Sequence, residues 1–389
     1  MIYSEYYDTK EIEKVWKSLK IDKAFHFFKL EDIFTNDYSL YMSIRKDAGK
    51  TTNALILGLI LHKIYSITFE YVRNDTAQTT IDSTSKLFET IKYFGYIEKI
   101  FKIYNDVEYS GRTKEFTLVW RSPEGEIERK EGESFMGVKS NEKWLSYKST
   151  YNRPKTWLII WDEFLDSTRP HGKLVSELMD NISTFTRDNP RAHVIGLSNT
   201  VNKYDAIFDD FAITNDLEHM EFGEYKNITS ALGTTLHVEL LPVSASRKQS
   251  IKDKHIRFYG FNNNKFAHLT GVEAWKGFNY PHLKDEAVKN YTLQYFIHHR
   301  DRWLSLSVIE FEDPDKQLAF LIAKSSPPKY IDRIIFTLNP ALVNEKLITN
   351  CSSFLKGCIN EGRLYFSSNE VGMLFDDFMR ESGVKMFRR

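Results

Sequence analysis

The sequence predicts an α/β protein with a mainly parallel sheet, followed by a smaller α+β region. Three strand-like segments carry this prediction: 38–44, 156–163 and 193–199. The first is followed by a helix-like run over 50–65, and the other two are almost continuously apolar until they end in polar residues. Continuous apolar character is typical of a central parallel strand that is covered on both faces.

The composition is that of an ordinary globular chain, and its 389 residues are enough for two domains. The two cysteines, Cys351 and Cys358, lie far from any histidine cluster, and we expect buried free thiols, as in a reducing cytoplasm. The N-terminus shows no secretory pattern, and the best apolar run, 54–65, is too short to span a bilayer. We therefore expect a cytoplasmic protein with no membrane partner.

The loop between the first strand and the first helix contains most of a phosphate-binding motif. The motif reads G-x-x-x-x-G-K-[ST]; Gly49, Lys50 and Thr51 are in place, but Ile44 stands at the first glycine position. The triplet alone is common, so the flanking strand and helix matter, because a helix N-terminus must point at the phosphate. We predict an ATP and Mg²⁺ site formed by Arg45, Lys46, Asp47, Ala48, Gly49, Lys50, Thr51 and Thr52.

Carboxylates and an amide end the two other strands. Asp162 and Glu163 close the segment 156–163, and Asn199 closes 193–199. Ligands of open α/β sheets bind at the carboxyl ends of the strands. We expect Lys50 to neutralise the β- and γ-phosphates, and Thr51 and Asp162 to hold Mg²⁺. Glu163 would activate the attacking water, and Asn199 would sense the γ-phosphate.

The remaining elements of the first part complete a recognisable order. A partly helical leader over 1–37 precedes the first strand, and 66–73 alternates as a strand that ends on Arg73. Spacing predicts helices over 80–105 and 174–185, and a hairpin of 115–120 with 126–129. The order is that of a RecA-like (ASCE) P-loop ATPase core, in which an extra catalytic strand is present.

The second part of the chain has a different pattern. We assign 1–204 to the ATPase domain, 205–245 to a lid or linker, and 246–389 to a smaller C-terminal domain. In that domain we predict strands near 256–259, 265–269, 303–311, 318–323 and 331–338, and helices near 350–361 and 369–382 with a short segment, 364–367, between them.

The charge is unevenly divided between the two parts. The chain is neutral overall, but 245–389 carries 22 basic and 16 acidic residues, a net charge of +6. A run of cations opens this part, and it forms either a solvated face or a contact surface for a phosphate backbone. Its members are Arg247, Lys248, Lys252, Lys254, Arg257 and Lys265.

Three segments together resemble a known family. They are WLIIWDEFL at 157–165, GLSNT at 196–200 and Tyr-Val-Arg at 71–73. They resemble the genome-packaging ATPases of small protein-primed phages, the phi-twenty-nine type encapsidation proteins, which are related to large terminase subunits. The resemblance implies ATP-driven translocation of double-stranded DNA into a procapsid by a homo-oligomeric ring at the portal vertex, in the host cell cytoplasm. It leaves a structural RNA partner open.

The resemblance also implies further site residues. Lys46 is similar to a basic residue of viral packaging P-loops, and Arg187 is the first candidate for an arginine finger given to a neighbouring subunit. Arg191, Arg73 and Lys148 compete with Arg187 for this role.

The C-terminal domain resembles a vestigial RNase H-like nuclease domain, which leaves two alternatives. A terminase proper would need carboxylates that converge on two metal ions. The candidates are Glu310, Glu312, Asp313, Asp315, Asp332, Asp376 and Asp377. The other alternative is a protein that binds nucleotide or DNA but does not hydrolyse ATP, because Ile44 has made the loop degenerate.

Overall fold

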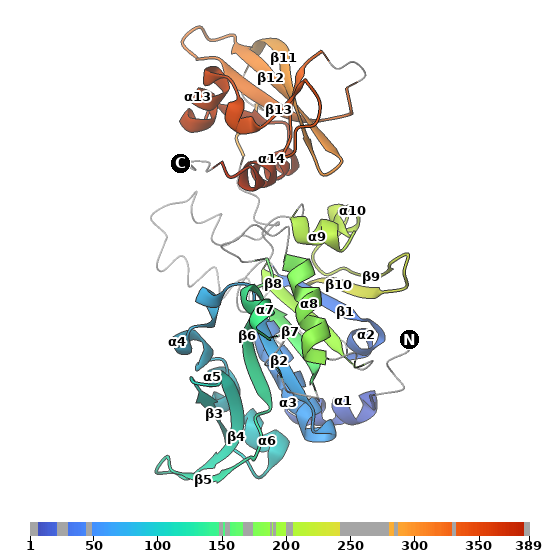
Figure 1. The fold of residues 1–389 in the computed structure, drawn as a ribbon, viewed down its shortest axis with the longest axis vertical. Helices are drawn as coiled ribbons and strands as arrows, with labels where there is room; N and C mark the ends of the chain where they lie inside the picture. The colour runs from blue at the N-terminus through green and yellow to red at the C-terminus, as the bar shows by residue number, and fades with distance from the viewer. Residues whose placement is uncertain are drawn as a thin grey trace. The chain divides into compact units, whose positions relative to one another are not determined.

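The structure is a computed structural model of the chain (Figure 1). It describes residues 7–21, 30–43, 49–147, 151, 156–165, 174–186, 189, 192–199, 205–241, 280–283, 287–328 and 332–384. The chain divides into two compact units: Met1–Thr200 with Asp209–Ala274, and Val201–Phe208 with Trp275–Arg389. Within the described residues, no helix is both long and apolar enough to cross a membrane.

The first unit is built on one mixed sheet, in the order β3-β4-β6-β2-β7-β8-β1-β10-β9, with β5 beside β4. Its centre is parallel, as predicted: β6 (Met136–Ser140), β2 (Thr68–Arg73), β7 (Thr156–Asp162), β8 (His193–Asn199), β1 (Tyr38–Ser43) and β10 (Thr235–Leu241). The antiparallel margins are β3 (Asp106–Ser110), β4 (Glu115–Arg121), β5 (Ile127–Lys130) and β9 (Tyr225–Thr229).

The position of β8 confirms the predicted RecA-like class. β8 pairs with β1 on one side and with β7 on the other, so an additional strand separates the loop strand from the acidic strand. Gly196 permits this close packing, because a Cβ atom at that position would lie 2.4 Å from Cδ2 of Leu40.

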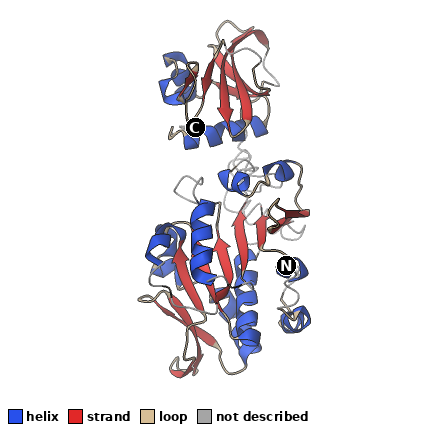
Figure 2. Cartoon of the chain, turned by 45° about the vertical axis from the view of Figure 1, so that its right-hand side comes forward, coloured by secondary structure: helices blue, strands red, loops and turns tan. Residues whose placement is uncertain are grey.

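Helices cover both faces of the parallel strands (Figure 2). α3 (Lys50–Tyr65) is buried from Asn53 to Leu61 and lies in the core with α1 (Thr9–Ser18), which Asp8 caps at its N-terminus. α2 (Leu30–Thr35) completes the partly helical leader. α8 (Leu174–Thr186) confirms the second predicted helix and packs against β7.

Two predictions for the first unit need correction. The segment 80–105 is not one helix; it forms three short helices, α4 (Ile81–Thr84), α5 (Glu89–Tyr93) and α6 (Tyr96–Phe101), and the 3-10 turn η2 (Thr76–Thr79) precedes it. Ile91 and Ile97 are buried as their spacing predicted, but Phe94 is exposed, and Gly95, at φ +64°, breaks the helix between α5 and α6. The hairpin of β4 and β5, in contrast, is confirmed.

The second correction concerns 205–245, which we predicted to be a lid or linker. It contains α9 (Ala206–Asp210), which falls across the division between the two units, and then, in the first unit, α10 (Thr214–Glu218) and the hairpin of β9 and β10. β10 runs parallel to β1 and is buried along most of its length, so this segment completes the main sheet. The basic run and the strands predicted at 256–259 and 265–269 lie outside the described residues.

The second unit is the smaller α+β domain, with a sheet in the order β15-β14-β11-β12-β13-β16. β11 (Val288–His299), β12 (Arg302–Phe311) and β13 (Ala319–Ser325) form an antiparallel meander, and β14 (Ile334–Phe336), β15 (Glu345–Lys346) and β16 (Leu364–Phe366) extend it in parallel.

Most of the second unit was predicted. α13 (Ser353–Glu361) and α14 (Asn369–Glu381) fall close to their predicted positions, and Cys351 and Cys358 are buried and free. We missed β11, because two register shifts along its pairing with β12 interrupt the alternation of buried and exposed residues.

Candidate active site

Four parallel strands end together at one edge of the main sheet. Ser43 of β1 is paired with Asn199 of β8, and Asp162 of β7 with Leu197. Val72 of β2 is paired with Trp161, so Arg73 comes level with Asp162. The register alone therefore brings the polar strand ends into one row.

Lys50 and Asn199 meet at this edge. Gly49, the N-cap of α3, has the left-handed φ of 74°, which costs another residue about 1–2 kcal/mol. Lys50 follows it and is only 7% exposed. Its Nζ atom donates to Oγ of Ser43 at 2.5 Å and to Oδ1 of Asn199 at 3.2 Å. These two contacts hold the ammonium group at the ends of β1 and β8.

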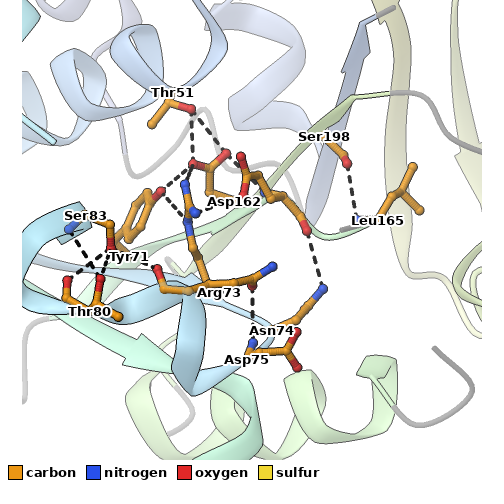
Figure 3. A network of polar contacts seen from close by, with 12 residues as sticks. Thr51, Tyr71, Arg73, Asn74, Asp75, Thr80, Ser83, Asp162, Leu165 and Ser198 are labelled. Carbon is orange, nitrogen blue, oxygen red and sulfur yellow. Dashed lines mark hydrogen bonds and ion pairs between the residues drawn. The ribbon is translucent and has the colours of Figure 1, made fainter. Parts of the chain in front are cut away.

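Thr51 and Asp162 form a second contact between the helix and the strands (Figure 3). The Thr51 hydroxyl donates to the carboxylate of Asp162, with both carboxylate oxygens 3.2 Å away. Hydroxyl and carboxylate oxygens are the hard ligands that Mg²⁺ prefers. The pair therefore fits a magnesium ion that is bound together with a nucleotide.

Tyr71 and Arg73 of β2 surround the same carboxylate. The Tyr71 hydroxyl donates to Oδ2 of Asp162, and the Nη2 atom of Arg73 lies 3.3 Å from that oxygen. Burial and the charge of Asp162 raise the pKa of Tyr71 well above its ordinary value. Burial lowers the pKa of Arg73, but Tyr71, Asp162 and Glu163 more than reverse this effect. Tyr71 thus stays a neutral donor and Arg73 stays a cation.

Glu163 lies directly beyond Asp162 and points to the same cation. Its side chain is 22% exposed, and its Oε2 atom is 2.9 Å from Nη1 of Arg73. Arg73 was one of four candidates for a finger that reaches a neighbouring subunit. In this structure its guanidinium is instead bound by two carboxylates of its own chain.

The other predicted residues fall into two groups. Thr52 lies in the first turn of α3 and is partly exposed. Arg45, Lys46, Asp47, Ala48, Arg187, Arg191 and Lys148 lie outside the described residues.

Sequence reasoning missed three polar residues at this edge. Ser43 ends β1, Tyr71 lies within β2 and Asn74 follows it. A polar residue at the end of an apolar strand was a signal for Ser43 and Asn74, whereas Tyr71 was named only as part of the segment 71–73, without a role in the site.

The strand order and the row of polar strand ends define an α/β protein with a RecA-like fold. No protein-family model matches the sequence, and no curated protein matches it. Among solved structures, the Phi-28 gp11 DNA packaging motor is similar over 94% of this chain and 100% of that one, with a TM-score of 0.52 and 12% identity.

Two further structures are similar at lower scores. The bacteriophage Phi-29 viral genome packaging motor assembly covers 92% of this chain and 99% of that one, with a TM-score of 0.49 and 16% identity. The Thermus phage P74-26 large terminase ATPase domain covers 67% and 97%, with a TM-score of 0.39 and 13% identity. The chain therefore has the fold of the Phi-28 gp11 motor protein, and the resemblance predicted from the sequence is confirmed at the level of fold.

Proposed function

We propose that this chain is an ATPase that moves double-stranded DNA into a viral procapsid, acting as a homo-oligomeric ring at the portal vertex. One observation carries the proposal: Lys50, Thr51, Asp162 and Asn199 converge at one sheet edge, with Glu163 beside them. The similar Phi-28 protein is named a DNA packaging motor, and from this name we infer that the substrate is DNA and that it is moved into the procapsid.

Each side chain has a chemical task in this proposal. Lys50 neutralises the β- and γ-phosphates, and Thr51 and Asp162 hold Mg²⁺, which supplies further positive charge against the phosphates. Glu163 orients the attacking water and takes its proton on a carboxylate oxygen. Asn199 contacts Lys50 and so is placed to respond when a γ-phosphate enters or leaves.

A ring would complete each site with a cation from the neighbouring subunit. We keep Arg187 as the first candidate and Arg191 and Lys148 as alternatives. Such a finger stabilises charge that develops in the transition state. Arg73 is a weaker candidate, because Asp162 and Glu163 bind it within the chain.

The proposed partners follow from the same reading. The positively charged part, 245–389, is the proposed grip on the DNA backbone, and the portal and procapsid are the proposed docking partners, in the host cell cytoplasm. A structural RNA has no support in the similar structures.

The structure weighs against the terminase alternative. Asp313 accepts from the backbone of Asp315 in an exposed turn, and Glu310 is bound by Lys289 and Asn290 on the surface. Among the described residues, one group of three side chains is close enough to share a metal: His299, Asp377 and Glu381.

The carboxylates of that group already form ion pairs with arginine side chains of the same chain. Arg300 pairs with both Asp377 and Glu381, and Arg380 pairs with Asp377 at 2.5 Å. A cluster neutralised by two guanidinium groups is a structural ion network rather than a nuclease centre. We therefore rank the packaging ATPase above a terminase with an active nuclease.

The proposal is tested by steady-state ATP hydrolysis with Mg²⁺, with and without long double-stranded DNA. We expect turnover that DNA increases, and we expect Glu163→Gln to lose turnover but to keep nucleotide binding. ATP turnover that DNA does not change would contradict the proposal that this ATPase moves DNA. No turnover at concentrations at which the chain assembles would favour the alternative of a binding protein with a degenerate loop.

A further inference from the structure

Asn74 is a fully buried amide next to the site that the proposed chemistry does not use. It follows β2 directly and has 0% of its surface exposed. Resting on the proposed function, we propose that Asn74 is a positioning residue. It holds the main chain of residue 163 in its left-handed conformation and so places the Glu163 carboxylate for the activation of water.

Three hydrogen bonds of the Asn74 side chain go to the turn that carries Glu163 or to the strand before it. Its Oδ1 atom accepts from the indole Nε1 of Trp161 at 2.7 Å, which fixes the orientation of the amide. Its Nδ2 atom then donates to the carbonyl oxygens of Phe164, at 2.8 Å, and Glu163, at 3.4 Å. Figure 3 shows the amide beneath this turn.

The turn needs such support because it is strained. Glu163 has a φ of 55°, in the region that favours glycine, and this costs an ordinary residue about 1–2 kcal/mol. Such strain persists only where surrounding contacts over-determine it, and it concentrates at functional sites. Two other bonds assist: Phe164 N donates to the Leu197 carbonyl, and Leu165 N donates to Ser198 Oγ.

Two successive residues, the last residue of β2 and the one after it, therefore act on different parts of Glu163. Arg73 binds the carboxylate, whereas Asn74 binds the main chain. The position of the Glu163 carboxylate therefore depends on its main-chain conformation as well as on its ion pair with Arg73. Because small displacements of a reacting group cost large factors in rate, a side chain that fixes this backbone acts on kcat.

Asn141 offers a matched control. It follows β6 as Asn74 follows β2, and it is also 0% exposed. Its Nδ2 atom donates to the carbonyl of Leu174 at 3.1 Å, and its Oδ1 atom accepts from Asn181 at 2.5 Å. These are the same kinds of bonds, but they hold α8 instead of the turn at Glu163.

The test compares Asn74→Ala with Asn141→Ala in the full chain. We expect both variants to lose similar thermal stability. Only Asn74→Ala should lower kcat, by about tenfold or more, while the KM for ATP and the binding of a fluorescent ATP analogue stay within about twofold of the unmodified chain. Trp161→Phe removes the hydrogen bond to Oδ1 of Asn74 and should lower kcat by a smaller factor.

A second readout does not depend on hydrolysis. Amide hydrogen exchange of a peptide that covers 162–166 should become faster in Asn74→Ala and stay unchanged in Asn141→Ala. Equal losses of kcat in the two variants, or unchanged exchange at 162–166, would overturn the positioning role. If the unmodified chain does not hydrolyse ATP, the proposed function fails, and the exchange experiment still decides what Asn74 does to the turn.

Discussion

The Nζ atom of Lys50 and the Oδ1 atom of Asn199 lie 3.2 Å apart, although 149 positions separate the two residues in the sequence. Lys50 begins α3 and Asn199 ends β8, so the contact joins the helix that follows the loop to the strand between β1 and β7. A phosphate that attracts the Lys50 ammonium must change this bond. In the proposed site, nucleotide binding would thereby be coupled to the end of a central strand.

Replacement of Lys50 should abolish hydrolysis. In Lys50→Ala, the phosphates lose their buried cation, and we expect turnover to fall by about 10³-fold or more, together with weaker nucleotide binding. Lys63→Ala is the control, because Lys63 is exposed in the last turn of the same helix. Hydrolysis assays and nucleotide titrations measure both effects; an active Lys50→Ala variant would contradict the assigned role.

Replacement of Asn199 should leave ATP binding intact but weaken the coupling between ATP hydrolysis and DNA. Asn199→Ala removes the acceptor from Lys50 but leaves Thr51 and Asp162 in place. We expect ATP to bind with little change, while the stimulation of turnover by DNA falls about tenfold. The measurement is the ratio of kcat with and without DNA. An unchanged ratio would contradict a role of Asn199 in coupling and would leave it only a structural role at the end of β8.

Mixing of subunits should show which arginine acts between subunits. A ring that mixes Arg187→Ala with Glu163→Gln subunits should regain part of its activity, since an intact Glu163 site can receive an intact Arg187 from its neighbour. Arg73→Gln mixed with Glu163→Gln should regain none, because Arg73 serves its own chain. Recovery in the second mixture but not in the first would exchange the two assignments.

Loss of the Tyr71 hydroxyl should weaken the hold on magnesium. Tyr71 donates to Oδ2 of Asp162, and in Tyr71→Phe this oxygen loses a neutral donor while the ring packing is kept. Removing an outer partner of a metal ligand commonly costs about 10–100-fold in metal affinity or activity. We expect the Mg²⁺ concentration for half-maximal hydrolysis to rise by about tenfold. Chelation of Mg²⁺ should stop turnover in both proteins, and an identical Mg²⁺ titration would exclude this role for Tyr71.

His193 should make the stability of the first unit depend on pH. Burial lowers its pKa from 6.5 to about 4, and its Nδ1 atom donates to the Asn36 carbonyl. The unfolded chain therefore binds a proton at higher pH than the folded chain does, so stability is complete above about pH 6.5 and is lost as the pH falls towards about 4. The shift corresponds to about 3 kcal/mol.

Denaturant unfolding between about pH 7 and 4 measures this dependence. His193→Asn keeps a donor for Asn36 but cannot take up a proton, so its free energy of unfolding should vary less over this range. The exposed His219 supplies the control, because His219→Asn should follow the unmodified chain. A His193→Asn curve parallel to that of the unmodified chain would contradict the prediction.

The amino-acid sequence by itself was sufficient to predict the parallel sheet, α3 and the strand ends that carry Asp162 and Asn199. These features are local, since an apolar run ended by a polar residue shows in a few consecutive positions. The break at Gly95 was also a local signal, but the spacing of apolar residues on either side of it concealed the turn.

Only the tertiary structure decided which of these strand ends lie next to each other and which other side chains contact them. Three features depend on the register between strands that are far apart in the chain. They are the pairing of β10 with β1, the ion pairs of Arg73 within its own chain, and the contacts of Tyr71 and Asn74. Register arises from the packing of the whole sheet, and a one-residue slip would turn each side chain to the opposite face. No short segment contains that information.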